Sequence, residues 1–214
     1  TVGGGFSFSG NAVATITGGI LEDNKAGSGG GMIIQGGANA VISNVTIRNN
    51  SARKHGGAIY VYMSTLEFRG GTVQENIASD RGGGIYASDN STLTVSGGKI
   101  TGFAKSGNGA AMYVYNAASV VEIQGVEFAN NTANQTSLAY GGGAIQIRNG
   151  NTTPVKIIGC KFTGNSSTGG SGAADPLGIA RENFIREYRN IMAHLVDGAP
   201  LLLDARQGRI PLSV

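Results

Sequence analysis

The chain has 214 residues, of which 37 are glycine, 14% are charged and 40% are hydrophobic, and its formal net charge is +3. Glycine at this level without a three-residue period excludes collagen, the 4 prolines argue against a disordered Gly/Pro segment, and the small charge gives no support for nucleic-acid binding. The single cysteine excludes an internal disulfide, and no apolar run reaches the length of a membrane-spanning helix.

A glycine-rich turn followed by a strand-like segment recurs from the start of the chain. The copies include "GGGMII" at 29–34, "HGGAIYVY" at 55–62, "GGGIYA" at 82–87, "GAAMYV" at 109–114 and "GGGAIQI" at 141–147. The first apolar residue after each turn is Phe6, Met32, Ile59, Ile85, Met112 or Ile145. Their spacings of 26, 27, 26, 27 and 33 residues indicate stacked supersecondary units. Because Thr1 leads directly into a repeat, we expect a chain processed or excised at its N-terminus.

Two further strand-like segments complete each unit. One appears as "VATIT", "AVIS", "TLEF", "TLTV", "VVEI" and "PVKI". The other centres on an apolar residue at Leu21, Ile47, Val73, Ile100, Phe128 or Phe162. In five of the six units an asparagine follows three positions later, at Asn24, Asn50, Asn76, Asn131 and Asn165. The fourth unit has Phe103 at this position, and the stacked asparagines of the others can hydrogen-bond along a ladder of turns.

The period of these segments is two residues, and no 3.6-residue periodicity is visible before residue 175, which excludes helical repeats. Three strands in about 27 residues predict one coil of a parallel β-helix, whose strands pair with their counterparts one coil away. We therefore predict an all-β, right-handed parallel β-helix over residues 1–167, with about six coils. Ile59 and Val61 then point into the core, while Tyr60 and Tyr62 point outward. An insertion around "NQTSLAY" lengthens the last coil and predicts a protruding loop.

The composition changes after the last coil. Residues 168–175 indicate a linker, and residues 176–214 contain a helical pattern followed by two short strand-like segments. Phe184, Tyr188, Met192 and Leu195 lie on one apolar stripe of this predicted amphipathic helix. Because such a stripe needs burial, we expect the helix to cap the open end of the solenoid or to dock onto a neighbouring subunit.

Paired motifs within the repeats resemble those of a known family. "GGAI" at 56–59 and 142–145, with "FANN" at 128–131 and "FTGN" at 162–165, resembles the GGA[ILV] and FxxN repeats of the chlamydial polymorphic outer membrane proteins. Those proteins are autotransporter adhesins with β-helical passenger domains, so the resemblance implies adhesion to host cells from an extracellular or cell-surface position. The likeness covers about residues 3–167, and similar repeats occur in other bacterial surface proteins.

An enzyme with this fold would need clustered carboxylates, which pectate lyases and polygalacturonases use to bind calcium or for acid–base catalysis. The best cluster in the repeats is Glu75 with Asp80, near Arg81, and solvated corner charges are the favoured explanation for it. His55 stands beside a turn without a Cys or Asp partner at metal-ligand spacing, and Cys160 aligns with small core residues. We therefore predict no catalytic residue, no metal site and no cofactor.

Five of the 7 tyrosines fall at equivalent outward positions. Tyr60, Tyr86 and Tyr113 occupy one position in three successive coils, and Tyr62 and Tyr115 lie two residues further on. Aromatic strips are typical of interfaces, although tyrosine is also simply a favourable strand residue. These tyrosines and the apolar stripe of the tail helix are the predicted binding or interface residues.

These features favour a non-enzymatic protein that acts in adhesion or as a structural scaffold, outside the cell or at its surface. The expected partner is another copy of the chain or a surface ligand, either protein or glycan, and not nucleic acid. Two alternatives stay open: a subunit that stacks end to end into an extracellular fibre, and a carbohydrate-active enzyme.

Overall fold

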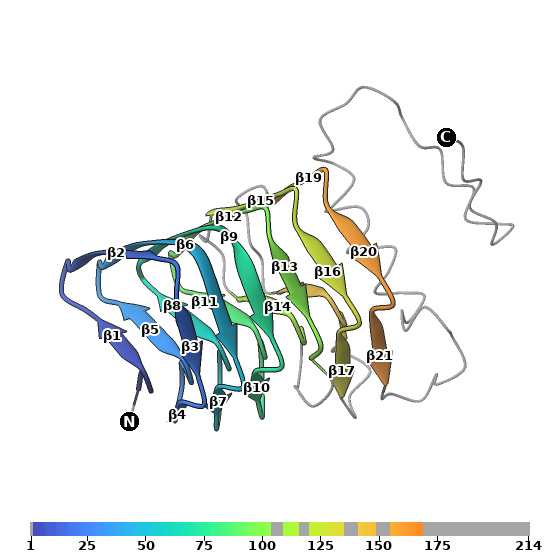
Figure 1. The fold of residues 1–214 in the computed structure, drawn as a ribbon, viewed down its shortest axis with the longest axis horizontal. Coiled ribbons are helices and arrows are strands. Elements are labelled where there is room, and N and C mark those ends of the chain that lie inside the picture. Colours follow the sequence, from blue (N-terminus) through green and yellow to red (C-terminus); the bar gives the residue numbers. More distant parts are fainter. Residues whose placement is uncertain (1, 104–108, 116–119, 135–140, 149–154, 169–214) are drawn as a thin grey trace, which may run out of the picture.

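The structure is a computed structural model that describes residues 2–103, 109–115, 120–134, 141–148 and 155–168. In these residues the chain winds through short strands, and each coil lies beside the next along one axis (Figure 1). All pairings between the described strands shown in register are parallel, as in the pairs β1–β5, β8–β11 and β6–β9. The described residues form no helix, and none of them belongs to a helix of the length and apolar character that crossing a membrane requires. The predicted all-β parallel solenoid is confirmed.

The first sheet collects the strand that follows the glycine turn of each coil. Its order is β1-β5-β8-β11-β14-β18. The strands are β1 (Phe6–Phe8), β5 (Met32–Gln35), β8 (Ile59–Tyr62), β11 (Ile85–Ser88), β14 (Met112–Tyr115) and β18 (Ile145–Arg148). The register pairs Met32 with Ile59, Ile59 with Ile85, and Met112 with Ile145, which confirms the alignment predicted from the spacing.

A larger sheet holds the other two strand positions, and β6 and β9 each run through both of them. Its strands are β2 (Val13–Thr17), β3 (Ile20–Glu22), β6 (Asn39–Arg48), β9 (Thr65–Gln74), β12 (Thr92–Ser96), β13 (Lys99–Thr101), β15 (Val120–Gln124), β16 (Glu127–Ala129), β19 (Val155–Ile158) and β20 (Lys161–Thr163). Short strands at one corner are β4 (Lys25–Ala26), β7 (Ser51–Ala52), β10 (Ile77–Ala78), β17 (Thr132–Asn134) and β21 (Ser166–Thr168). Strands of all three positions therefore surround one interior.

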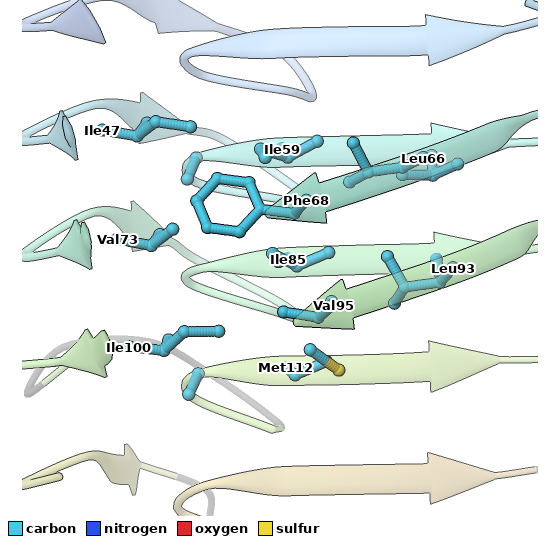
Figure 2. Packing of buried hydrophobic residues seen from close by; sticks show 14 of the residues in the cluster. Ile47, Ile59, Leu66, Phe68, Val73, Ile85, Leu93, Val95, Ile100 and Met112 are labelled. Atoms are coloured by element: carbon cyan, nitrogen blue, oxygen red, sulfur yellow. The ribbon is translucent and has the colours of Figure 1, made fainter. Parts of the chain in front are cut away.

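Apolar side chains of successive coils stack in columns inside the solenoid (Figure 2). Two of these columns are Ile47–Val73–Ile100 and Ile59–Ile85–Met112, whose members are at most 1% exposed. Phe6 heads the second column but is 41% exposed, because β1 has a neighbouring strand on one side only. The expected interior column is thus confirmed in the middle coils and open to solvent at Phe6.

Left-handed backbone at the corners explains the abundance of glycine and asparagine. The residue before the stacked asparagine has φ 59° at Asp23, 55° at Asn49, 55° at Glu75 and 55° at Asn130, and Gly102 takes this place in the fourth coil with φ 78°. Asparagine, aspartate and glycine adopt this conformation at the lowest steric cost. Glu75 adopts the same left-handed conformation as these residues, so it occupies a structural position at the corner.

Asn24, Asn50 and Asn76 form the predicted ladder. Nδ2 of Asn24 donates to Oδ1 of Asn50 at 2.9 Å, and Nδ2 of Asn50 donates to Oδ1 of Asn76 at 2.8 Å. The same two oxygens also accept from the backbone N–H of Asn24 and of Asn50. Each rung thus joins one coil to the next through both side chain and main chain.

Phe103 interrupts this ladder in the fourth coil. Its side chain is 1% exposed and belongs to the core cluster. Beyond it the ladder resumes, where Nδ2 of Asn131 donates to Oδ1 of Asn165 at 2.8 Å. Oδ1 of Asn131 is buried without a hydrogen-bond partner, because Phe103 offers no side-chain amide.

Several predictions fall outside the described residues. They are the loop at 135–140, most of the linker, and the tail helix with its stripe of Phe184, Tyr188, Met192 and Leu195. The strand-like segments that follow the helix also lie there, so all of these stay predictions.

Candidate functional site

The outward positions of the first sheet carry the tyrosine face, which comprises Tyr60, Tyr62, Tyr86, Tyr113 and Tyr115. Side chains alternate along β8, so Ile59 and Val61 belong to the core while Tyr60 and Tyr62 lie on the opposite side of the sheet. The register pairs Tyr60 with Tyr86, and Tyr86 with Tyr113, in consecutive coils. The predicted alignment of the tyrosines is confirmed.

Only part of the tyrosine face reaches solvent. Tyr62 is 36% exposed, and Tyr60 and Tyr115 are partly exposed. By contrast, Tyr86 is 3% exposed and Tyr113 is 0% exposed. Tyr86 and Tyr113 thus occupy the predicted outward positions without being open to solvent.

Corner side chains cover the two buried tyrosines. The imidazole ring of His55 stacks on the ring of Tyr86, with centroids 4.6 Å apart and an interplanar angle of 14°. The guanidinium carbon of Arg81 lies 5.5 Å from the ring centroids of both Tyr113 and Tyr115. His55 and Arg81 pair with each other as a parallel bridge, so they occupy equivalent corner positions in adjacent coils. Each corner thus packs its side chain onto the tyrosine of the next coil.

The tyrosine rings also contact one another along the rod. Tyr60 and Tyr86 meet edge to face at 5.1 Å between centroids, and Tyr86 stacks on Tyr113 at 5.5 Å with an interplanar angle of 15°. Tyr62 and Tyr115 flank this row, with centroids 6.1 Å from Tyr60 and 6.4 Å from Tyr113. Aromatic pairs of this kind contribute about 0.5–1.5 kcal/mol each beyond the burial of area. The row is therefore a rigid base that fixes the exposed rings.

Asp80 brings negative charge to the covering residues. Its carboxylate lies 3.6 Å from Nδ1 of His55 and 3.5 Å from Nε of Arg81. The corner of the next coil thus brings Asp80 beside His55, and among the described residues this pair belongs to no group of three or more metal-ligating side chains. The structure confirms the expected proximity of Asp80 to Arg81. Glu75 instead occupies the left-handed corner position described above.

Burial shifts the ionisation of these groups. Burial raises the pKa of the Tyr86 hydroxyl to about 12, although a hydrogen bond with Arg81 opposes this. It also raises the pKa of Tyr60. For His55, burial lowers the pKa below its ordinary value, with Asp80 acting against this and Arg81 and Lys54 reinforcing it. At neutral pH the face therefore presents neutral phenol and imidazole rings beside the charged pair of Asp80 and Arg81.

Acidification is expected to destabilise the chain through His55. The imidazole of the unfolded chain protonates near 6.5, while that of the folded chain requires a lower pH, so between the two values the unfolded state binds more protons. The stability contributed by neutral His55 is fully present above 6.5 and is lost as the pH falls through this window. The melting temperature of His55→Phe, which keeps a ring on Tyr86, should therefore fall less between about pH 7 and 5 than that of the wild type. Identical pH profiles for the two proteins would contradict this assignment.

Other titratable residues are dispersed over the outer surface. Ion pairs join adjacent coils between Glu22 and Arg48 at 2.7 Å, and between Glu127 and both Lys99 and Lys161 at 3.6 Å. In the part of the chain that the structure describes, no group of three or more His, Cys, Asp or Glu side chains is placed to hold a metal ion. Cys160 packs against the core with its thiol 3.5 Å from the carbonyl of Ile158, as expected of a small core residue.

Sequence reasoning missed three residues of this face. His55 and Arg81 stand at equivalent places 26 residues apart, so the repeat alignment already contained the signal that they share a corner. Met63 follows Tyr62 and is 47% exposed with φ 48°, a left-handed conformation that is uncommon for so large a residue. The Met63 side chain therefore adds an exposed apolar group beside Tyr62.

Comparison with known protein families matches residues 4–175 to the right handed beta helix region. Neither the search of curated proteins nor the search of solved structures gives a match. The matched region includes every coil described above and ends at 175, where the composition of the chain changes.

Proposed function

The chain belongs to the right-handed β-helix family, and from this premise we propose that it is a non-enzymatic recognition module that acts in adhesion or as a scaffold outside the cell. The fold is shared by adhesins, scaffolds and carbohydrate-active enzymes, so the argument has to come from surface chemistry. Carboxylates of the described residues contact cationic side chains in several places, as Glu22, Glu122 and Glu127 do. Such pairing favours a structural use of these charges over acid–base catalysis.

The exposed edge of the tyrosine face is the observation that carries this proposal. Tyr62 and Met63 are 36% and 47% exposed, and Tyr60 and Tyr115 are partly exposed beside Arg81. Tyrosine, methionine and arginine are the residue types enriched at the centres of protein interfaces. We therefore favour a partner protein as the ligand.

The buried base below these residues supports binding as well. Tyr60 contacts Tyr86, and Tyr115 contacts both Tyr113 and Arg81, so the exposed rings are held by packed neighbours. A surface that is already ordered loses less conformational entropy when a partner binds. The exposed tyrosines of the tyrosine face, from β8 to β14, are thus already ordered before a partner binds.

Replacing Tyr62 and Tyr115 together by alanine is expected to weaken partner binding by at least about 30-fold, since truncation of a single aromatic hot spot already costs about 2 kcal/mol or more. Binding of the labelled chain to whole cells and to immobilised extracellular-matrix proteins measures this effect. The matched control is Val120→Ala on the larger sheet, which removes a side chain that is 46% exposed and should leave binding unchanged. Equal losses in both variants, or no loss in either, would contradict the proposal.

Two other outcomes would redirect the assignment. Binding that the tyrosine variant loses on a glycan array, but keeps on immobilised proteins, would identify a glycan as the ligand. Depolymerisation of an acidic polysaccharide by the purified chain, abolished by Glu75→Ala, would favour the carbohydrate-active enzyme instead.

End-to-end assembly is the second candidate, favoured by the two ends of the described solenoid. Phe6 is 41% exposed at one end and Phe162 is 48% exposed at the other, although both belong to interior columns. Stacking of one copy on another would bury both rings and pair the free strand edges. Negative-stain electron microscopy separates the candidates, because fibres support assembly and single rods support a recognition module.

A further inference from the structure

The corner beside the tyrosine face carries two cations without a carboxylate partner. Arg53 and Lys54 are exposed, and within the part of the chain that the structure describes neither one forms an ion pair. The cations of the larger sheet, by contrast, lie 2.6–3.6 Å from a glutamate carboxylate. Asp80, the carboxylate of this corner, already contacts His55 and Arg81. The corner therefore has a local excess of positive charge.

These two cations belong to the segment that borders the tyrosine face. Lys54 directly precedes His55, whose ring stacks on Tyr86, and its carbonyl oxygen accepts from the N–H of Arg81 at 3.3 Å. The ammonium group of Lys54 is close enough to the imidazole to contribute to the lowered pKa of His55. A ligand on the exposed edge of the tyrosine face therefore meets positive charge along one border.

Met63 stands at the opposite border, in a backbone conformation that methionine rarely adopts. It is the first residue after β8 and has φ 48°. The first residues after β5 and β11 are Gly36 and Asp89, with φ 64° and 52°. Glycine and aspartate adopt left-handed backbone more readily than a large apolar residue does, so the fold alone favours either of them at this corner. An exposed side chain kept in a strained conformation points to a contact that needs it.

We propose that the tyrosine face binds an acidic segment of its partner protein, with carboxylates at the basic corner of Arg53 and Lys54 and apolar side chains on the opposite border. Tyr62 and Met63 form that apolar border. This inference rests on the proposed function and adds the chemistry of the partner. Complementary charge speeds association and selects among partners, while aromatic and thioether groups supply adaptable apolar contact. Asp89 lies at the corner after β11, on the same side as Met63, so the acidic residues of the partner fit the basic corner only.

Defined polymers test this chemistry on the full chain. We expect the chain to bind immobilised poly(Glu,Tyr), a random copolymer of acidic and aromatic residues, more tightly than heparin or polygalacturonate. Binding should weaken at least about 10-fold between about 0.15 M and 1 M salt, where the Debye length falls from about 8 to 3 Å. Tighter binding to either glycan would identify an anionic glycan as the ligand and overturn the proposal, and so would a failure to bind poly(Glu,Tyr).

Neutralising the basic corner separates its effect from that of overall charge. Arg53→Gln combined with Lys54→Gln should slow association with poly(Glu,Tyr) about 10-fold and leave dissociation nearly unchanged, because charges at the rim of an interface act mainly on association. The matched control combines Arg48→Gln with Arg69→Gln, which removes the same net charge from the larger sheet and should keep both rates. Equal slowing in the two double variants would contradict the proposed role of the corner.

Replacing Met63 by asparagine should affect binding and stability in different directions. Dissociation from poly(Glu,Tyr) should become about 10-fold faster, while the melting temperature stays the same or rises, because asparagine tolerates left-handed backbone. Gly36→Asn is the matched control, since it places the same residue at the equivalent corner one coil earlier and should not change dissociation. A fall in melting temperature together with weaker binding would assign Met63 a structural role, and this result or unchanged dissociation would overturn the contact at this border.

Binding to whole cells distinguishes a failure of this inference from a failure of the proposed function. Weaker binding of both the Tyr62/Tyr115 and the Arg53/Lys54 double variants would support the acidic partner. A loss in the tyrosine variant alone would overturn the acidic partner and keep the recognition module. Unchanged binding in both variants would overturn the two proposals together.

Discussion

Replacing Asn50 by alanine is expected to lower the free energy of unfolding by at least about 3 kcal/mol, because several buried polar groups then lose their partners. Asn50 is 0% exposed, accepts from Nδ2 of Asn24 and donates to Oδ1 of Asn76. Its Nδ2 atom also lies 2.9 Å from the carbonyl oxygen of Leu21. Alanine would leave these groups desolvated and unpaired on both sides of the coil. Chemical denaturation followed by circular dichroism measures the loss.

The control for this ladder prediction is Asn39→Ala. Asn39 begins β6 and is exposed, so its side chain can exchange protein contacts for water at little cost. We expect a change within about 0.5 kcal/mol for this substitution. Similar losses for Asn50→Ala and Asn39→Ala would show that the ladder contributes little to stability.

Replacing Gly57 by alanine is expected to destabilise the chain by about 3 kcal/mol or more, because the new methyl group overlaps the backbone of the next coil. A Cβ atom at this position would overlap the carbonyl oxygen of Gly83 and lie 2.6 Å from the carbonyl carbon of Ile77. Main-chain atoms cannot rotate away as a side chain can, so the two coils would have to separate. A fall in the denaturation midpoint, with loss of soluble protein on expression, is the expected readout.

Gly141→Ala is the matched control for Gly57→Ala. Among the residues that the structure describes, a Cβ atom at Gly141 meets nothing closer than Oγ of Ser167 at 3.5 Å, which is an ordinary contact. This substitution should therefore change the midpoint little. Comparable losses at Gly57 and Gly141 would mean that chain entropy, and not close approach between coils, explains the glycine content.

The architecture could be predicted because its determinants are local and repeat at a fixed interval. Register between Met32, Ile59 and Ile85 follows directly from their spacing, since each strand pairs with its own counterpart. The asparagine ladder follows for the same reason, as Asn24 and Asn50 are 26 residues apart and bond to each other. Where every coil repeats the same contacts, one correct alignment determines them all.

The tyrosine face was predicted less completely, because alternation along a strand shows which side a residue faces and not what lies above it. Tyr86 and Tyr113 do face away from the core, yet His55 and Arg81 cover them from the corners of preceding coils. Each corner side chain thus covers a tyrosine that belongs to the following coil. This displacement by one coil depends on how the corner folds back over the sheet. Asp80 was placed near Arg81 correctly, but its approach to His55 crosses from one coil to the next and becomes visible only when the two corners are aligned.

The ladder from Asn24 to Asn76 also bears on how such a chain changes length during evolution. Asn24 and Asn50 each make the same bonds to the asparagine 26 residues ahead, so these two rungs are equivalent in their hydrogen bonding. A tandem duplication of one such coil would insert a rung with both its partners already present, and would lengthen the rod by about 4.8 Å. A duplication at Phe103 would have no matching rung, because its neighbour Asn131 keeps an unpaired Oδ1 atom. Growth by whole coils is therefore easiest in the N-terminal half, away from the residues that follow the last coil.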